Sequence, residues 1–183
     1  QSYYYVTTGT GLDFSAATTA QTMLQDGTGT ANTRGITLVS GTTYEFDMVF
    51  NVQYQSLGDS ATPLSFGWTR TTVSGTPTTT ITSVIDYGSN TTSFATATTL
   101  STINGSATTT VSFTSPGASG SRYITYRGKG IIRVTGTSAS VKIYPSIASG
   151  GGTTVNVPTV QTNGYFKLTP IGNGTVTTVG AFA

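Results

Sequence analysis

The chain has no cysteine and no histidine among its 183 residues. Without cysteine there is no disulfide framework, no thiolate nucleophile and no cysteine-ligated zinc. Without histidine the commonest general base is missing, and so are the serine–histidine and cysteine–histidine nucleophile pairs and most transition-metal sites. Few classes of enzyme remain, so we expect no enzymatic activity, no catalytic residues, no bound metal and no cofactor.

Charge is also scarce, because Asp, Glu, Lys and Arg make up only 8% of the chain, against about 25% in an average domain. Threonine and serine fill the polar positions instead. The composition is not typical of disorder, since 10 Tyr, 8 Phe and many β-branched residues are present and favour strands. No apolar run approaches the roughly 18 residues that a membrane span needs. We therefore expect one folded domain and no membrane partner.

Alternation with a period of two is the strongest pattern in the chain. From Tyr44 to Tyr54, large apolar residues occupy every second position and mostly polar residues lie between them, which predicts a long central strand. A second long strand is predicted from Tyr123 to Thr135. Gly128 and Gly130 fall in its apolar register, which indicates a bulge or a close approach of another backbone or a large aromatic side chain. The residues predicted to share one core are Phe46, Met48, Phe50, Ile124, Ile132 and Val134.

Several shorter segments also favour strands, and turn residues such as Ser40-Gly41, Ser74-Gly75 and Asn104-Gly105 separate them. They are Ile36–Val39, Leu64–Thr69, Thr79–Tyr87, Thr108–Phe113, Val141–Tyr144, Tyr165–Leu168 and Val176–Val179. No helical segment is expected. The pattern predicts an all-β fold, an antiparallel β-sandwich of the jelly-roll kind, over residues 36–183. Residues 1–35 are expected to form an N-terminal arm that docks on a neighbour, a short peripheral strand, or a loosely packed terminus.

The charges divide unevenly along the chain. All six carboxylates lie in residues 1–86 with two arginines, whereas residues 87–183 carry six cations and no carboxylate. Acidic and basic strands can therefore pair within a sheet or between subunits, and the third possibility is a solvated face without a specific partner. The candidate charge contacts are Glu45, Asp47, Arg127, Lys129 and Arg133.

Two functional classes have little support in these charges. Six spread cations are too few for the dense basic patch that binds nucleic acid, so no nucleic-acid partner is expected. Glu45 and Asp47 lie two residues apart on one face of one strand, whereas paired catalytic carboxylates of glycosidases face each other across a cleft. We therefore expect this pair to be solvated or ion-paired.

The C-terminal half carries several segments in a recurring order. They are Gly128-Lys129-Gly130-Ile131-Ile132-Arg133-Val134, Val141-Lys142-Ile143-Tyr144-Pro145, Gly150-Gly151-Gly152, Asn163-Gly164-Tyr165-Phe166-Lys167-Leu168-Thr169-Pro170-Ile171-Gly172 and Thr175-Val176-Thr177-Thr178-Val179-Gly180. With Leu38–Phe46 and Ser65–Trp68 upstream, this order resembles a module of tailed-phage virion proteins, including those of cyanophages. The resemblance covers roughly Ile36 to Ala183. One departure is Gly164, where the module usually has serine, so the local turn is expected to differ.

The resemblance implies a β-sandwich that trimerises and decorates capsids or builds fibres, without catalytic residues. A homotrimer on the surface of the virion, in contact with the major capsid protein or another virion protein, is the expectation that follows. The alternative is a tail or head fibre domain that binds a host-surface carbohydrate, with Tyr3, Tyr4, Tyr5, Trp68 or Tyr87 stacking on sugar rings. For Trp68, a place in the core is the competing interpretation.

Overall fold

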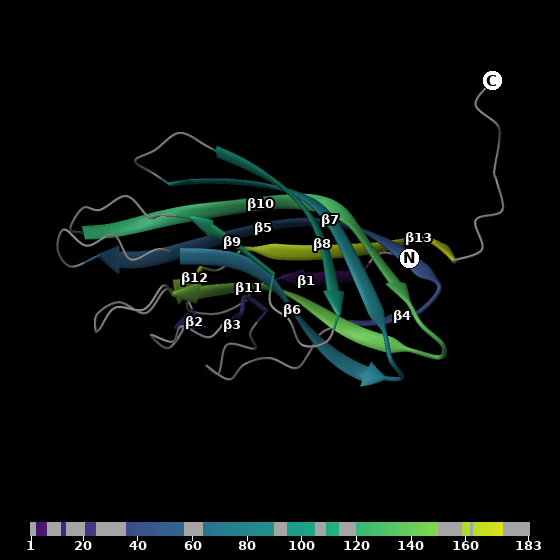
Figure 1. Ribbon diagram of the computed structural model, residues 1–183. Helices are drawn as coiled ribbons and strands as arrows, with labels where there is room; N and C mark the ends of the chain where they lie inside the picture. Colours follow the sequence, from purple (N-terminus) through teal and green to yellow (C-terminus); the bar gives the residue numbers. More distant parts are fainter. Residues whose placement is uncertain are drawn as a thin grey trace, which may run out of the picture.

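The computed structural model describes residues 3–6, 12–13, 21–24, 36–56, 64–89, 95–104, 109–113, 120–149, 159–161 and 163–173. Within these ranges the regular elements are β-strands, and no helix is present. The strands form two antiparallel sheets that pack against each other as a β-sandwich (Figure 1). The all-β prediction is therefore confirmed.

The larger sheet has eight strands and the smaller sheet has five. In spatial order, the main path of the larger sheet is β1 (Tyr3–Val6), β13 (Tyr165–Asn173), β5 (Thr42–Ser56), β10 (Gly120–Thr135), β7 (Thr78–Ser89) and β8 (Ala95–Asn104), with β12 (Thr159–Val160) beside β5 and β2 (Leu12–Asp13) beside β12. The smaller sheet runs β3 (Gln21–Thr22), β11 (Ser140–Ser149), β6 (Leu64–Ser74) and β9 (Thr109–Phe113), with β4 (Thr37–Val39) also paired to β11.

Strands from the first half of the chain pair with strands from the second half in nested order. β1 pairs with β13, β4 with β11, β5 with β10 and β6 with β9, and successive pairs alternate between the larger and the smaller sheet. This nested pairing is the connectivity of a jelly roll. The β7–β8 pair is inserted between β6 and β9 and extends the larger sheet beyond β10.

The two long predicted strands are β5 and β10, and they are antiparallel neighbours. Their register runs from Gly120 opposite Ser56 to Arg133 opposite Thr43. All six residues predicted to share a core belong to one buried cluster, because the period-two pattern turns one side of each strand toward the smaller sheet.

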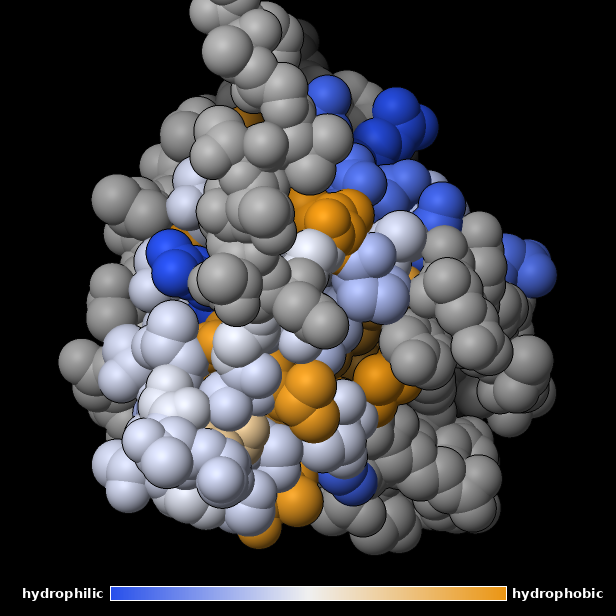
Figure 2. All heavy atoms as spheres, turned by 90° about the vertical axis from the view of Figure 1, so that its right-hand side faces the viewer, coloured by the Kyte–Doolittle hydropathy of each residue, from blue (hydrophilic) through white to orange (hydrophobic). Residues whose placement is uncertain are grey.

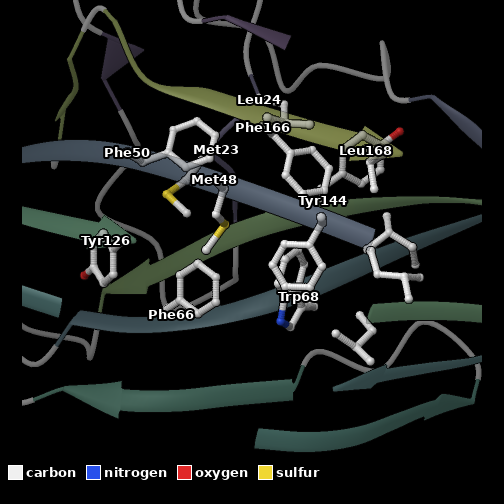
Figure 3. Close-up of a cluster of buried hydrophobic side chains, with 14 of the residues drawn as sticks. Met23, Leu24, Met48, Phe50, Phe66, Trp68, Tyr126, Tyr144, Phe166 and Leu168 are labelled. Carbon is white, nitrogen blue, oxygen red and sulfur yellow. The ribbon is translucent and has the colours of Figure 1, made fainter. Parts of the chain in front are cut away.

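Aromatic side chains from both sheets meet in the middle of the core. Phe66 and Trp68 of β6 lie between the sheets (Figure 3), and the ring of Trp68 has its centroid 4.9 Å from that of Phe46 and 6.1 Å from that of Phe166. Phe66 stacks on Tyr126 of β10 with centroids 5.6 Å apart. Rings of β6 thus contact rings of β5, β10 and β13 across the space between the sheets. Offset and edge-to-face ring pairs stabilise the packing beyond the burial of their apolar area.

Gly130 marks a close approach of backbone and of an aromatic ring, as predicted, whereas Gly128 is approached by the aliphatic side chains of Met48 and Ile85, and neither glycine marks a bulge. A β-carbon on Gly130 would lie 2.0 Å from the backbone oxygen of Thr82 and 2.8 Å from the ring of Phe46. One on Gly128 would lie 2.5 Å from the terminal methyl of Met48. The register of β10 with both neighbours passes the two glycines without a shift.

Other expectations have mixed outcomes. Residues 3–6 form the peripheral strand β1 at the edge of the larger sheet, which is one of the forms expected for the N-terminal segment. No strand was expected between Tyr87 and Thr108, yet β8 occupies half of that interval. Its threonines, alanines and serines alternate without contrast in hydropathy, so the period-two signal is weak there. The predicted strand Val176–Val179 lies outside the described residues.

Candidate functional site

The outer side of the larger sheet carries an array of ionisable side chains on four adjacent strands. We call this surface the charged face, and it comprises Glu45, Asp47, Asp86, Arg127, Lys129, Arg133, Tyr165 and Lys167. These side chains are exposed or half-buried. They occupy the register of β13, β5, β10 and β7 that alternates with the core residues, so the strands themselves direct them away from the smaller sheet.

Opposite charges stand beside each other on this face. Asp47 of β5 lies opposite Lys129 of β10 on one side and opposite Lys167 of β13 on the other. Two residues along β10, Arg127 stands opposite Asp86 of β7. Directly opposed residues in antiparallel strands have β-carbons about 4.5–5.5 Å apart. Both carboxylates are therefore flanked by cations of the same sheet.

The structure brings only part of the predicted charge set into direct opposition. Asp47 and Lys129 are opposed, whereas Glu45 lies opposite Ile131 and Arg133 lies opposite Thr43. Arg127 stands opposite Val49 on the β5 side. Pairing within the sheet is thus available to the acidic stripe, Glu45 and Asp47 of β5, and to the basic stripe, Arg127, Lys129 and Arg133 of β10. The energetic role of these contacts stays a prediction.

Asp86, Tyr165 and Lys167 belong to the charged face, although the sequence analysis did not single them out. The sequence shows that these residues share a face with their neighbours, because alternate residues of a strand point to the same side. Val84 and Asp86 are two residues apart in one predicted strand, and Tyr165 and Lys167 are two residues apart in another. What the sequence did not reveal was that β7 and β13 flank β10 and β5. Those neighbours are joined by non-local pairings.

Tyr165 is held against Asp47. Its hydroxyl donates a hydrogen bond to Oδ2 of Asp47 over 3.3 Å. Partial burial raises the pKa of the phenol, and the charge and hydrogen bond of Asp47 raise it further, against the opposing effect of Lys167 and Arg127. The phenol is therefore a hydrogen-bond donor at neutral pH.

A hollow of about 450 Å³ opens on the charged face. It is lined by Asp47, Met48, Val49, Val84, Asp86, Arg127, Gly128, Lys129 and Tyr165. The ionisable members come from four neighbouring strands, while Val49 and Val84 supply aliphatic surface. The hollow thus combines hydrogen-bonding groups with two aliphatic side chains of the same outward register.

A second surface lies at the end of the sandwich where the β4–β5, β6–β7 and β10–β11 turns meet. We call it the turn end. Three aliphatic side chains are exposed there: Val39 at 48%, Val73 at 51% and Ile171 at 53%. Figure 2 views this end and shows hydrophobic residues among weakly polar ones. These exposed aliphatic residues at the ends of β4, β6 and β13 are candidates for a contact surface.

Backbone and side-chain hydrogen bonds fasten the turns of this end to one another. The amide of Ser40 donates to the carbonyl of Ala139 and that of Gly41 to the carbonyl of Val134, each over 2.9 Å. Arg70, buried at this end of the core, donates from Nη1 to the carbonyl of Pro77 over 2.7 Å. Burial lowers the pKa of its guanidinium. The turn end is therefore a braced surface that can be presented to a partner without reordering.

The aromatic residues expected to stack on sugars have other places. Trp68 is only 2% exposed and packs among the core rings, so it is a core residue, and stacking on an external ligand is ruled out for it. Tyr87 is half-buried against the same core. The side chains of Tyr3, Tyr4 and Tyr5 lie outside the described residues.

In the ranges that the structure describes, no three Asp or Glu side chains gather closely enough to hold a metal ion. The same ranges contain no helix long and apolar enough to cross a membrane. No family model, curated protein or solved structure matches the chain. The charged face, its hollow and the turn end are consequently the features on which a function has to be argued.

Proposed function

We propose that the chain is a non-enzymatic structural component of a tailed-phage particle that decorates or cements the capsid surface as a homotrimer. The turn end carries this proposal, because a chain with so little charge exposes three aliphatic side chains at the same end of the sandwich, where hydrogen bonds brace the turns. Burying such a surface against another subunit removes apolar area from water and desolvates few charges. The contact therefore suits permanent assembly.

The sequence resemblance supports the same class. Its most characteristic segment, Asn163–Gly172, includes most of β13, the strand between β1 and β5 in the larger sheet. The segment Gly128–Val134 lies in β10 and Val141–Pro145 lies in β11. The resembling segments are thus the framework of the sandwich, and the trimer number comes from this resemblance alone.

The charged side chains of the larger sheet are better suited to contacts within the subunit than to contacts between subunits. Its carboxylates stand beside cations of their own sheet, so a second subunit is not needed to balance them. The turn end lies five residues from Asp47 along β5, which at about 3.3 Å per residue is roughly 16 Å. The part of the charged face around Asp47 is therefore separate from the surface proposed for assembly, whereas Arg133 lies opposite Thr43, beside the turn end.

Addition of the purified chain to phage particles that lack it tests the proposal. We expect stoichiometric binding to capsids, seen as regularly spaced density in electron micrographs. Val73→Lys and Ile171→Lys should abolish incorporation because each places a charge in the contact. Thr82→Lys, an exposed strand position on the charged face, is the matched control and should incorporate normally. Failure of the unaltered chain to bind capsids, or binding confined to tails and fibres, would contradict capsid decoration.

The non-enzymatic part of the proposal has its own test. Asp47→Asn and Asp86→Asn remove the two carboxylates that line the hollow, and both variants should incorporate into particles like the unaltered chain. Loss of a polysaccharide-cleaving activity in either variant, with the fold intact by circular dichroism, would show that the chain is an enzyme.

A further inference from the structure

The hollow on the charged face has a lining that selects a particular class of ligand. Four ionisable side chains and one phenol point to it from β13, β5, β10 and β7. Its volume of about 450 Å³ lies in the range of small-molecule sites. Because its strands form the middle of the larger sheet, the lining groups are positioned by paired backbone and not by loops.

Donors and acceptors alternate around the hollow. Arg127 offers up to five N–H donors and Lys129 three, whereas the carboxylates of Asp47 and Asp86 accept only. Tyr165 already points its hydroxyl at Asp47 over 3.3 Å, which leaves the carboxylate with further acceptor positions. A ligand that matches this rim needs several groups that both donate and accept, and hydroxyl groups have that property.

The balance of charge excludes other classes. Two carboxylates face two cations in the lining, so a phosphate or a nucleic-acid backbone would lie beside Asp47 and Asp86 and be repelled. A divalent cation would lie beside Arg127 and Lys129. A purely apolar ligand would remove water from four charged groups without replacing their hydrogen bonds. The remaining class is neutral and rich in hydroxyl groups.

Two aliphatic side chains complete the lining. Val49 and Val84 lie on the outer side of β5 and β7, beside the charged groups. A pyranose ring has hydroxyl groups around its edge and C–H groups on its faces, so its face can cover a valine while its edge reaches the charged side chains. We propose that this hollow binds a neutral saccharide of one or two rings, with Asp47, Asp86, Arg127 and Lys129 holding its hydroxyl groups.

This inference goes beyond the proposed particle role and does not depend on it, because the turn end and the hollow are separate surfaces. It also differs from the carbohydrate site expected from the sequence, which relied on Trp68 or Tyr87. The recognising groups are instead carboxylates, a guanidinium and an ammonium on the outer side of the sheet.

A glycan array followed by titration in solution tests the inference. The probes are immobilised neutral oligosaccharides from bacterial capsules and O-antigens, and the best-retained one is then titrated by calorimetry. Asp86→Asn and Arg127→Gln should each weaken binding at least tenfold. Glu45→Gln and Arg133→Gln are the matched controls, since they lie on the same face and strands but outside the lining, and both should bind within twofold of the unaltered chain.

Two outcomes would overturn the inference. One is that no neutral saccharide is retained by the unaltered chain, including the case in which inorganic phosphate or a peptide binds instead. The other is that the lining variants and the controls lose binding equally. Thermal melts guard against misfolding, and Tyr165→Phe provides a further variant that removes only one hydroxyl from the lining. Incorporation of the same variants into particles is measured in parallel, so failure of saccharide binding and failure of the particle role are distinguished.

Discussion

Gly130 lies where β10 passes closest to β7 and to the ring of Phe46. A β-carbon there would meet the Thr82 backbone oxygen at 2.0 Å, and paired backbone cannot move away as a flexible side chain can. We predict that Gly130→Ala lowers the free energy of unfolding by about 1–3 kcal/mol, the usual cost of overpacking a core. Urea or guanidinium denaturation of the purified variant measures this change.

Gly172 provides the matched control for that substitution. No atom lies within 4 Å of the position that its β-carbon would take, and Gly172 is exposed. Gly172→Ala should leave stability unchanged or raise it by up to about 1 kcal/mol, because alanine restricts the unfolded chain. Equal destabilisation by both substitutions would show that the close approach at Gly130 is absent in solution.

Tyr165 should titrate above the ordinary tyrosine pKa of 10.0. The folded chain holds this proton more tightly than the unfolded chain, so the phenol favours folding below about pH 10 and its contribution is lost as the pH rises through the folded pKa. Carbon-13 NMR of labelled tyrosine, assigned with Tyr165→Phe, follows the titration. Asp47→Asn should lower the midpoint, since it removes the negative charge that raises the pKa and leaves the opposing charges of Lys167 and Arg127 in place. A midpoint that Asp47→Asn leaves unchanged would contradict the contact.

At the scale of the element, β5 carries a carboxylate, Asp47, that lies opposite a lysine of β10 on one side and a lysine of β13 on the other. Asp47→Lys would face Lys129 and Lys167 with a third cation, and we predict a loss of stability of about 1 kcal/mol or less, as for exposed pairs. Adding Lys129→Glu should restore part of the loss, and assembly should stay intact in both variants. A double-mutant cycle by denaturation, repeated at high salt, measures the coupling.

Glu45→Lys is the control for this reversal, because Glu45 stands opposite Ile131 and Thr169 and not opposite a cation. Its effect on stability should be smaller than that of Asp47→Lys. If neither reversal changes folding or assembly at any salt concentration, both stripes are merely solvated. If both weaken assembly, the acidic stripe contacts another subunit.

Strands with contrast in hydropathy were predictable from the sequence, and their neighbours were not. The alternation in Tyr44–Tyr54 and Tyr123–Thr135 identified β5, β10 and their core residues, because burial of one face imposes that pattern. The Thr-rich β8 lacked the contrast and was missed. That Asp86 stands opposite Arg127, and Lys167 opposite Asp47, depends on pairings between residues far apart in the chain, which no local pattern encodes.

At the scale of the whole molecule, two surfaces have different chemistry. The charged face balances its own carboxylates and cations, whereas the turn end exposes Val39, Val73 and Ile171. Nested jelly-roll pairing places the β4–β5, β6–β7 and β10–β11 turns at one end of the sandwich (Figure 1). The fold therefore places apolar residues that are distant in sequence at the same end of the sandwich, and the central claim is that this end joins subunits.

Sedimentation equilibrium of the purified chain at micromolar concentration tests that claim most directly. The account predicts the mass of a trimer for the unaltered chain, of 18.8 kDa per subunit, and for Thr82→Lys, and the mass of a monomer for Val73→Lys and Ile171→Lys. A monomer at every concentration for the unaltered chain, with no association on particles, would contradict it.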